Sequence, residues 1–278
     1  MGLGAGRIGG PDLSHADVDR LVGAALDAGV TLIDTARSYG DSEERLGRAL
    51  ADRRERFVLS TKVGYGVPGV QDWTGDCVAS GVDAALGRLA TGWIDIVHLH
   101  SCSLEVLRQG DVVPALTRAV EAGKVRVAAY SGEGDALAWA VRSGAFGAVQ
   151  CSVSLVDQGA LDGPVAEASA RGIGVLAKRA LGNAPWRFPN RPAEPDVADA
   201  WDRFGALSLP APPAGWIGLF ARFAAHAPGV SAVLVGTASP SHLAEVVDAV
   251  RCGPLADEEV EEVRAAFARV GRTWSGRV

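Results

Sequence analysis

The sequence predicts a single-domain (β/α)8 TIM barrel covering residues 1–278. Short runs rich in valine and isoleucine alternate with longer segments of helical periodicity along the whole chain. With a short first strand near the N-terminus, this alternation contains eight strand–helix units, which is the pattern of an α/β barrel. A length of 278 residues, 48% of them hydrophobic, suits either one large barrel or two small domains. Since no linker interrupts the alternation, we expect one barrel.

The strands are expected where apolar, β-branched runs are too short to form a helix. After the first short strand they fall at residues 30–34, 57–63, 94–100, 125–131, 148–152, 174–179 and 232–236. The carboxyl ends of such strands form the functional edge of a barrel, so residues at these ends are the candidates for chemistry.

The helices are expected where apolar residues recur every three or four positions after a capping residue. Ser14 and Asp17 form a capping-box pattern before the first helix, Ser42 is the expected cap of the second, and Thr74 is that of the third. The predicted helices cover residues 14–28, 42–52, 75–90, 112–122, 135–143, 161–171, 216–226 and 240–250, with a further C-terminal helix at 257–270.

Residues 183–213 stand outside this alternation. The segment is rich in proline and is too long for an ordinary connection. We expect a loop over the barrel mouth that contains a short helix near residues 197–204.

The composition excludes several classes of function. The formal net charge is -6 and the basic residues are scattered, which predicts neither nucleic-acid nor membrane-surface binding. No apolar run approaches the roughly 20 residues that span a bilayer, and the N-terminus lacks the pattern of a signal peptide. The four cysteines are widely spaced without a C-x-x-C pair, which predicts buried free thiols and no zinc site. We therefore expect a cytoplasmic, metal-free protein.

A G-x-G-x-x-G string runs from Gly4 to Gly9. The dinucleotide fingerprint with this spacing needs a full strand before it and a helix directly after it. Only three residues precede Gly4, and Pro11 and Asp12 follow the glycines, so the string does not predict a Rossmann fold.

Polar residues stand at the ends of three consecutive predicted strands. Asp34 ends the second strand, Lys62 lies near the end of the third, and His100 ends the fourth. A lysine in a strand that is otherwise apolar needs a partner, and Asp34 is the nearest candidate. His98 shares a face with His100 but lies deeper, so we interpret it as a core residue.

The segment from Asp34 to Gly47 reads D-T-A-x-x-Y-G-x-S-E-x-x-L-G, and the fourth strand reads I-D-x-x-x-L-H. Both patterns resemble those of the aldo-keto reductase family. The resemblance implies a catalytic tetrad of Asp34, Tyr39, Lys62 and His100. A cation beside a phenol stabilises the phenolate, so Lys62, held by Asp34, would make Tyr39 a proton donor to a carbonyl oxygen. By the same resemblance His100 would hydrogen-bond that oxygen.

The resemblance also implies a nicotinamide dinucleotide as the hydride donor. The residues that match its binding positions are Gly4, Ala5, Gly6, Asp34, Ser131, Gln150, Lys178, Arg179, Leu181, Gly236, Ala238, Ser239, His242 and Glu245. Three positions depart from the family pattern: Lys178 replaces a common aromatic, Gly132 an asparagine after Ser131, and Val246 an asparagine after Glu245. Family members usually begin with a β-hairpin across the barrel floor, which we do not expect here.

The turn after the eighth strand predicts NADP, as NADPH, rather than NAD. Residues 236–243 contain no acidic side chain that would repel a 2′-phosphate, while Ser239 and His242 can donate hydrogen bonds to it. Arg179 and Arg222 are further candidates. A strand, a glycine turn and a helix N-terminus together suit a phosphate.

Two other functions stay open. Lys178 could act as a Schiff-base nucleophile in an aldolase-like barrel, with Arg179 helping to depress its pKa. Alternatively, the protein could be a non-catalytic cofactor sensor that regulates a partner. The expected partner is a small carbonyl or alcohol substrate, and the sequence fixes neither its identity nor the oligomeric state.

Overall fold

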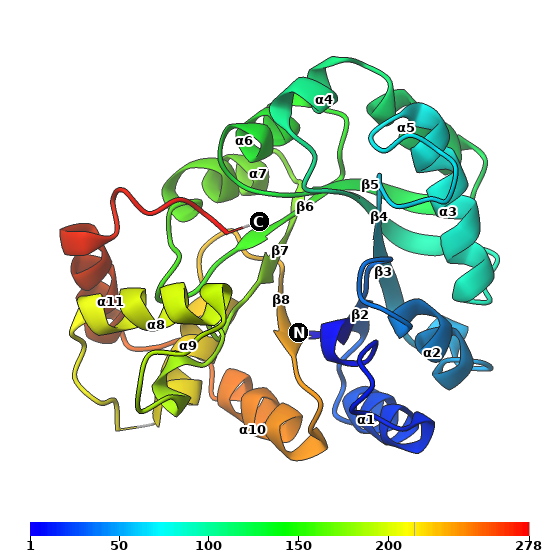
Figure 1. Cartoon of the computed structure of the whole chain (residues 1–278). Helices are drawn as coiled ribbons and strands as arrows, with labels where there is room; N and C mark the ends of the chain where they lie inside the picture. The colour runs from blue at the N-terminus through cyan, green and yellow to red at the C-terminus, as the bar shows by residue number, and fades with distance from the viewer. Residues whose placement is uncertain (214, 278) are drawn as a thin grey trace.

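The computed structural model of the chain describes residues 1–213 and 215–277. Within these residues eight parallel strands close into a barrel in sequence order, so that β1 pairs with both β2 and β8 (Figure 1). The strands are β1 (Gly2–Gly4), β2 (Leu32–Asp34), β3 (Val58–Val63), β4 (Ile94–His100), β5 (Val125–Ser131), β6 (Ala148–Ser152), β7 (Gly174–Lys178) and β8 (Ala232–Gly236). The predicted fold class is confirmed.

Helices surround the barrel on all sides in Figure 1. They are α1 (His15–Asp27), α2 (Ser42–Ala49), α3 (Gly75–Arg88), α4 (Leu104–Arg108), α5 (Val112–Glu121), α6 (Gly134–Ser143), α7 (Ala166–Ala170), α8 (Pro195–Leu207), α9 (Gly215–Ala225), α10 (Pro240–Arg251) and α11 (Asp257–Val270). Two of the three predicted N-caps are present, since the hydroxyl of Ser14 accepts from the backbone N–H of Asp17 and that of Thr74 from Cys77. The prediction for Ser42 is wrong: Ser42 is the first residue of α2, and its hydroxyl donates to the carbonyl of Ala5 at 3.0 Å instead of capping the helix.

The barrel interior changes from apolar to polar along the strands. An apolar cluster inside the barrel consists of Leu32, Ala129, Ala148, Leu176 and Leu234. Side chains alternate across a strand, so the residues two positions further on also face inward. These are Asp34, Ser131, Gln150, Lys178 and Gly236, and they stand at or near the carboxyl ends. The main apolar core lies outside the strands, between them and the helices.

Two segments differ from the prediction. The helix expected over residues 161–171 begins as a π-helical turn (Leu161–Val165), in which the N–H of Val165 reaches the carbonyl of Ala160. Pro164 lies within this turn and has no N–H to donate, which explains the irregular start. In residues 183–213, α8 is longer than the predicted short helix because Pro195 occupies its first turn, where proline favours a helix start.

The four cysteines are free thiols. Cys77, Cys102 and Cys151 are buried as expected, whereas Cys252 is exposed because it follows α10 on the outer surface. In residues 1–213 and 215–277, we find no helix long and apolar enough to cross a membrane. The same residues contain no group of three or more His, Cys, Asp or Glu side chains placed to hold a metal ion.

Candidate active site

The predicted catalytic residues lie together at the carboxyl ends of β2, β3 and β4. The ammonium of Lys62 is 2.6 Å from Oδ2 of Asp34, and both side chains are buried. Lys62 also donates to the backbone carbonyl of Thr35 at 2.8 Å. The pairing of Lys62 with Asp34 that the sequence suggested is therefore present in the structure.

The second oxygen of Asp34 is held as firmly as the first. Ser60 donates its hydroxyl to Oδ1 at 2.8 Å, and the amide of Gln150 donates to the same atom at 3.1 Å. Burial opposes the charge on Asp34, but the Lys62 ammonium and the hydrogen bond from Ser60 outweigh it and lower the pKa of Asp34. Burial likewise opposes the charge on Lys62, yet the Asp34 carboxylate raises the pKa of Lys62. Lys62 is therefore a permanent cation at the base of the site.

Tyr39 lies over this cation. The Lys62 ammonium is 4.9 Å from the centroid of the Tyr39 ring. The turn that presents Tyr39 requires two glycines: a Cβ on Gly9 would stand 1.4 Å from the carbonyl oxygen of Tyr39, and Gly40 has a φ of 55°. The N-terminal glycine run thus allows the chain to pass against the tyrosine turn, although it forms no Rossmann loop.

His100 completes the group. Its ring lies edge-on to Tyr39, with ring centroids 6.3 Å apart. Burial and the nearby Lys62 cation lower the pKa of His100 to about 3, so its imidazole is neutral at pH 7. His98 is fully buried, and Nε2 is 3.1 Å from the hydroxyl of Ser60. Burial lowers the pKa of His98 to about 4, which agrees with a neutral core histidine.

Ser131 at the end of β5 and Gln150 in β6 are register partners. The Ser131 hydroxyl donates to Oε1 of Gln150 at 3.1 Å, while the amide nitrogen of Gln150 reaches Asp34. The two residues therefore connect the tetrad to the far wall of the barrel.

The turn between β8 and α10 lies beside the end of β1. Gly4 and Gly236 are register partners, and a Cβ on Gly4 would be 3.4 Å from the backbone nitrogen of Gly236. Ala5 is buried and its carbonyl accepts from Ser42, whereas Gly6 lies against the Tyr39 ring. The glycines at the end of β1 thus border both the tyrosine and the turn.

The turn itself exposes small residues and a helix N-terminus. Gly236 and Ala238 are exposed, and Ser239 caps α10 by accepting from the backbone N–H of His242 at 3.4 Å. The side chain of His242 is exposed at this N-terminus. This arrangement presents backbone N–H groups and a partial positive charge, which suits a phosphate.

A recess of about 350 Å³ lies between α9 and α10. Its lining includes Glu245 of α10, Trp216 of α9 and Trp186 of the 3-10 turn Pro185–Arg187. An aromatic wall with a carboxylate fits a base and a ribose.

The comparisons with known proteins identify the family of the chain. The model of the "Aldo/keto reductase family" matches residues 1–202, which include the four tetrad residues. The chain belongs to the aldo/keto reductase family. A 6-dehydroglucose reductase of Novosphingobium aromaticivorans is 37% identical over 127 residues, which cover 42% of this chain and 41% of that protein. The match thus spans about two-fifths of this curated relative.

Solved aldo-keto reductases share the fold over most of the chain. A putative aldo-keto reductase from Pseudomonas aeruginosa is 28% identical, with a TM-score of 0.72 over 90% of this chain and 88% of that one. The holo form of an aldo-keto reductase from Bacillus halodurans gives a TM-score of 0.84 at 21% identity, over 96% of this chain and 91% of that one. This second likeness concerns the fold alone.

Two departures from the aldo-keto reductase pattern have a structural reason. A Cβ on Gly132 would lie 2.3 Å from the hydroxyl of Tyr130, which occupies the space that a side chain after Ser131 would need. Val246 is buried on α10 in a cluster with Val235, so it contacts the core and not the turn.

The third departure, Lys178, has partners that the sequence did not reveal. Its ammonium is 3.2 Å from Oε1 of Glu133 and donates to the carbonyl of Arg277 at 2.8 Å. Ser152 donates to the same carbonyl at 3.2 Å, so the C-terminal tail reaches the mouth beside β6 and β7. Burial lowers the pKa of Lys178, and it raises the pKa of Glu133. Glu133 follows Ser131 by two residues, a spacing that could have identified it.

The remaining predicted residues of this wall lie at its edge. Arg179 has a φ of 55° and its guanidinium is 3.1 Å from Oδ2 of Asp196. Leu181 is half-buried and packs against the core. Arg222, a further candidate for the 2′-phosphate, donates to the carbonyls of Gly253 and Pro254. Arg222 is therefore tied to the turn after α10.

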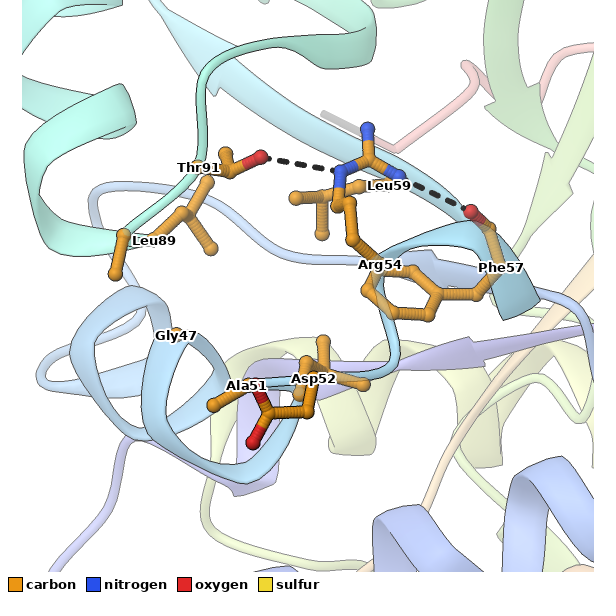
Figure 2. A pocket seen from close by; sticks show the side chains of 10 residues that line it. Gly47, Ala51, Asp52, Arg54, Phe57, Leu59, Leu89 and Thr91 are labelled. Carbon is orange, nitrogen blue, oxygen red and sulfur yellow. Dashed lines mark hydrogen bonds between the residues drawn. The ribbon is translucent and has the colours of Figure 1, made fainter.

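A second, smaller cavity of about 70 Å³ lies where β3 starts, at the end of the barrel opposite the tetrad. Figure 2 shows the side chains that line it. It is bordered by the end of α2, the start of β3 and the end of α3, with Gly47, Phe57 and Leu89 among its lining residues. Arg54 crosses it and donates to Thr91 and to the carbonyl of Phe57. Because this arginine already has protein acceptors and the tetrad is at the other end, the cavity is a structural feature of the barrel floor.

Proposed function

We propose that the protein is a cytoplasmic, NADP-dependent oxidoreductase that interconverts an aldehyde or ketone and its alcohol. The observation that carries the proposal is the buried Lys62 ammonium, held at 2.6 Å by Asp34 and lying 4.9 Å from the centre of the Tyr39 ring. A buried cation costs free energy, so a cation kept beside a phenol needs a reason. Stabilising a phenolate that forms during proton transfer supplies one.

The side chains divide the reaction between them. Tyr39 gives its hydroxyl proton to the carbonyl oxygen as the carbon is reduced, and takes a proton from the alcohol in reverse. Lys62 stabilises the resulting phenolate, and Asp34 holds Lys62 in place. His100, neutral at pH 7, donates a hydrogen bond from Nε2 to the same oxygen and so orients the substrate. A bound nicotinamide dinucleotide supplies the hydride.

The residues present fit such a dinucleotide. Gly4 and Gly236 leave the mouth open beside β1 and β8, and the exposed N-terminus of α10 suits the phosphates. The recess at Glu245 and Trp216 has the size and lining for the adenosine end. Ser131 and Gln150 would hold the carboxamide. Ser239 and His242, with no acidic residue from Gly236 to Leu243, favour the 2′-phosphate of NADPH.

Lys178 supports a second candidate, a Schiff-base reaction. Burial lowers its pKa, which favours the nucleophilic amine, although Glu133 and the Arg277 carbonyl both engage the nitrogen. Borohydride trapping of a carbonyl compound on Lys178 would support this reaction. The third candidate is a non-catalytic cofactor sensor, but such a role does not explain why all four residues of the tetrad are present. Binding of a partner protein without turnover would support this role.

The test is a panel of aldehydes, ketones and alcohols followed at the absorbance of the reduced nicotinamide. The panel includes a sugar oxidised to an aldehyde at C6, because one relative is a 6-dehydroglucose reductase. We expect turnover with NADPH, and we expect Tyr39→Phe to lower kcat by roughly 10²- to 10⁴-fold while the affinity for NADPH stays within about twofold, since only the proton donor is lost. Full activity of Tyr39→Phe would overturn the assignment.

A further inference from the structure

The inference concerns the second tyrosine near His100, and it rests on the proposed reaction. Tyr65 lies in the segment after β3, and its hydroxyl is 3.0 Å from Nδ1 of His100. The two rings are also stacked, with centroids 5.5 Å apart and an interplanar angle of 25°. Tyr65 thus contacts His100 both by its ring and by its hydroxyl, which fixes the imidazole in two ways.

The segment after β3 holds Tyr65 in this position. Trp73 packs on Tyr65 with ring centroids 5.3 Å apart, and the N–H of Trp73 donates to the carbonyl of Gly64 at 2.7 Å. A Cβ on Gly64 would lie 2.3 Å from the Trp73 ring, so only glycine allows this return of the chain. The N–H of Gly66 donates to Asp72 at 2.7 Å and closes the turn. The sequence from Gly64 to Trp73 therefore builds a support for one phenol.

A neutral imidazole carries one proton, on either Nδ1 or Nε2. The partner of one nitrogen decides which nitrogen is protonated. The phenol is a stronger acid than a neutral imidazole N–H, and the imidazole nitrogen is the better acceptor. The contact at Nδ1 is therefore an O–H···N hydrogen bond from Tyr65, which leaves the proton of His100 on Nε2.

We propose that Tyr65 is a positioning residue that selects the Nε2–H tautomer of His100, the only one that can donate from Nε2 to a carbonyl oxygen. In the other tautomer, Nε2 would present a lone pair to the lone pairs of the substrate oxygen. A tautomer has to be selected because His100 is neutral, since burial and the Lys62 cation lower its pKa. A doubly protonated imidazole would donate from both nitrogens and would need no such selection.

The chain has three tyrosines, and they provide a matched set of Tyr→Phe variants. Tyr65→Phe keeps the ring stacked on His100 and removes only the hydroxyl. Tyr130→Phe is the control, because its hydroxyl donates to the carbonyl of Cys102 at 2.8 Å and its ring packs on Phe146. We expect kcat/KM to fall about tenfold in Tyr65→Phe, equivalent to about 1.4 kcal/mol, and to stay within about twofold in Tyr130→Phe. NADPH affinity should stay unchanged in both.

The tautomer is measured directly by the ¹⁵N shifts of histidine side chains in protein labelled with ¹⁵N-histidine. His100→Gln identifies the His100 signals among those of the five histidines. We expect His100 as the Nε2–H tautomer in wild type and in Tyr130→Phe, and as a mixture of tautomers in Tyr65→Phe. An Nδ1–H tautomer in wild type, an unchanged tautomer in Tyr65→Phe, or equal losses of kcat/KM in both variants would each overturn the proposal. This measurement needs no turnover, so it separates a wrong role for Tyr65 from a wrong reaction.

Discussion

The two sides of the barrel mouth satisfy their polar groups in different ways. Over β2 to β4, Asp34 takes hydrogen bonds on both oxygens from within the barrel, and each partner comes from a strand. Over β7 and the adjoining wall, Lys178 takes its partners from Glu133 after β5 and from Arg277 near the C-terminus. The first set of contacts is part of the barrel itself, whereas the second depends on segments that connect strands or follow the last helix.

The electrostatics show the same difference. Lys62 and Asp34 favour each other's charge, since the pKa of Lys62 is raised and that of Asp34 is lowered. Lys178 and Glu133 both shift toward their neutral forms because burial outweighs their attraction. The barrel therefore keeps Lys62 and Asp34 as a charged pair, whereas burial favours the neutral forms of Lys178 and Glu133 at β7.

The largest expected effect compares the three lysines of the chain. Lys62→Met leaves the Asp34 carboxylate buried without its cation and should lower the free energy of unfolding by about 3–5 kcal/mol. Lys178→Met should cost less, because Glu133 can take up a proton. Lys124→Met, which removes an exposed pair with Asp83, should cost at most about 1 kcal/mol. Chemical denaturation at pH 7 measures all three.

A double variant sharpens this test. Asp34→Asn added to Lys62→Met removes the unpaired charge and should recover part of the lost stability. If Lys178→Met is as destabilising as Lys62→Met, the two sides of the mouth do not differ in the way described.

The sequence predicted the tetrad side of the mouth better than the β7 side, and the reason is physical. Asp34, Lys62 and His100 end consecutive strands, and parallel register brings strand ends together without further information. The tail carbonyl that meets Lys178 lies 99 residues away along the chain and belongs to no repeating element. Its position depends on side-chain packing that periodicity does not encode.

The same limit applies to single side chains. The sequence does not pair Tyr65 with His100, because this hydrogen bond depends on how the chain returns from Gly64 to Trp73. The space that excludes a side chain at Gly132 depends likewise on the Tyr130 hydroxyl.

A smaller effect is expected from the core histidine beneath the tetrad. The pKa of His98 is lowered to about 4 from 6.5. Between pH 6.5 and pH 4 the unfolded chain binds a proton at His98 that the folded chain excludes. The contribution of His98 to stability is therefore complete above pH 6.5 and is lost progressively as pH falls toward 4. The advantage of wild type over His98→Gln should shrink by roughly 1 kcal/mol per pH unit between pH 6.5 and 4.

Wild type has to be compared with His98→Gln because another group, Asp157, changes the stability with pH in the opposite direction. Burial raises the pKa of Asp157 to about 7, so its contribution to stability declines as pH rises. Denaturation curves for both proteins at pH 4.5, 5.5, 6.5 and 7.5 separate the two. A difference that does not change with pH would mean that His98 is not held neutral.

The smallest expected effect concerns the nucleotide side of the mouth. NADPH should bind about tenfold or more tightly than NADH, near 1.4 kcal/mol, because Ser239 and His242 can pair with the 2′-phosphate. The difference should shrink with added salt, because salt screens the charge of the phosphate. His242→Gln should weaken the binding of NADPH and leave that of NADH unchanged. Fluorescence titrations measure these affinities, and equal affinities at pH 6 and low salt would show that the turn does not recognise the phosphate.

The most direct test of the central claim follows the hydride and the proton together. Wild type and Tyr39→Phe are each mixed with NADPH that carries deuterium at the transferable position of C4 and with the best carbonyl substrate, and the alcohol is analysed by mass spectrometry. We expect wild type to place one deuterium on the carbinol carbon, and Tyr39→Phe to bind the cofactor equally well yet form the labelled alcohol roughly 10²- to 10⁴-fold more slowly. Labelled alcohol formed at the wild-type rate by Tyr39→Phe, or alcohol without deuterium from wild type, would contradict the mechanism.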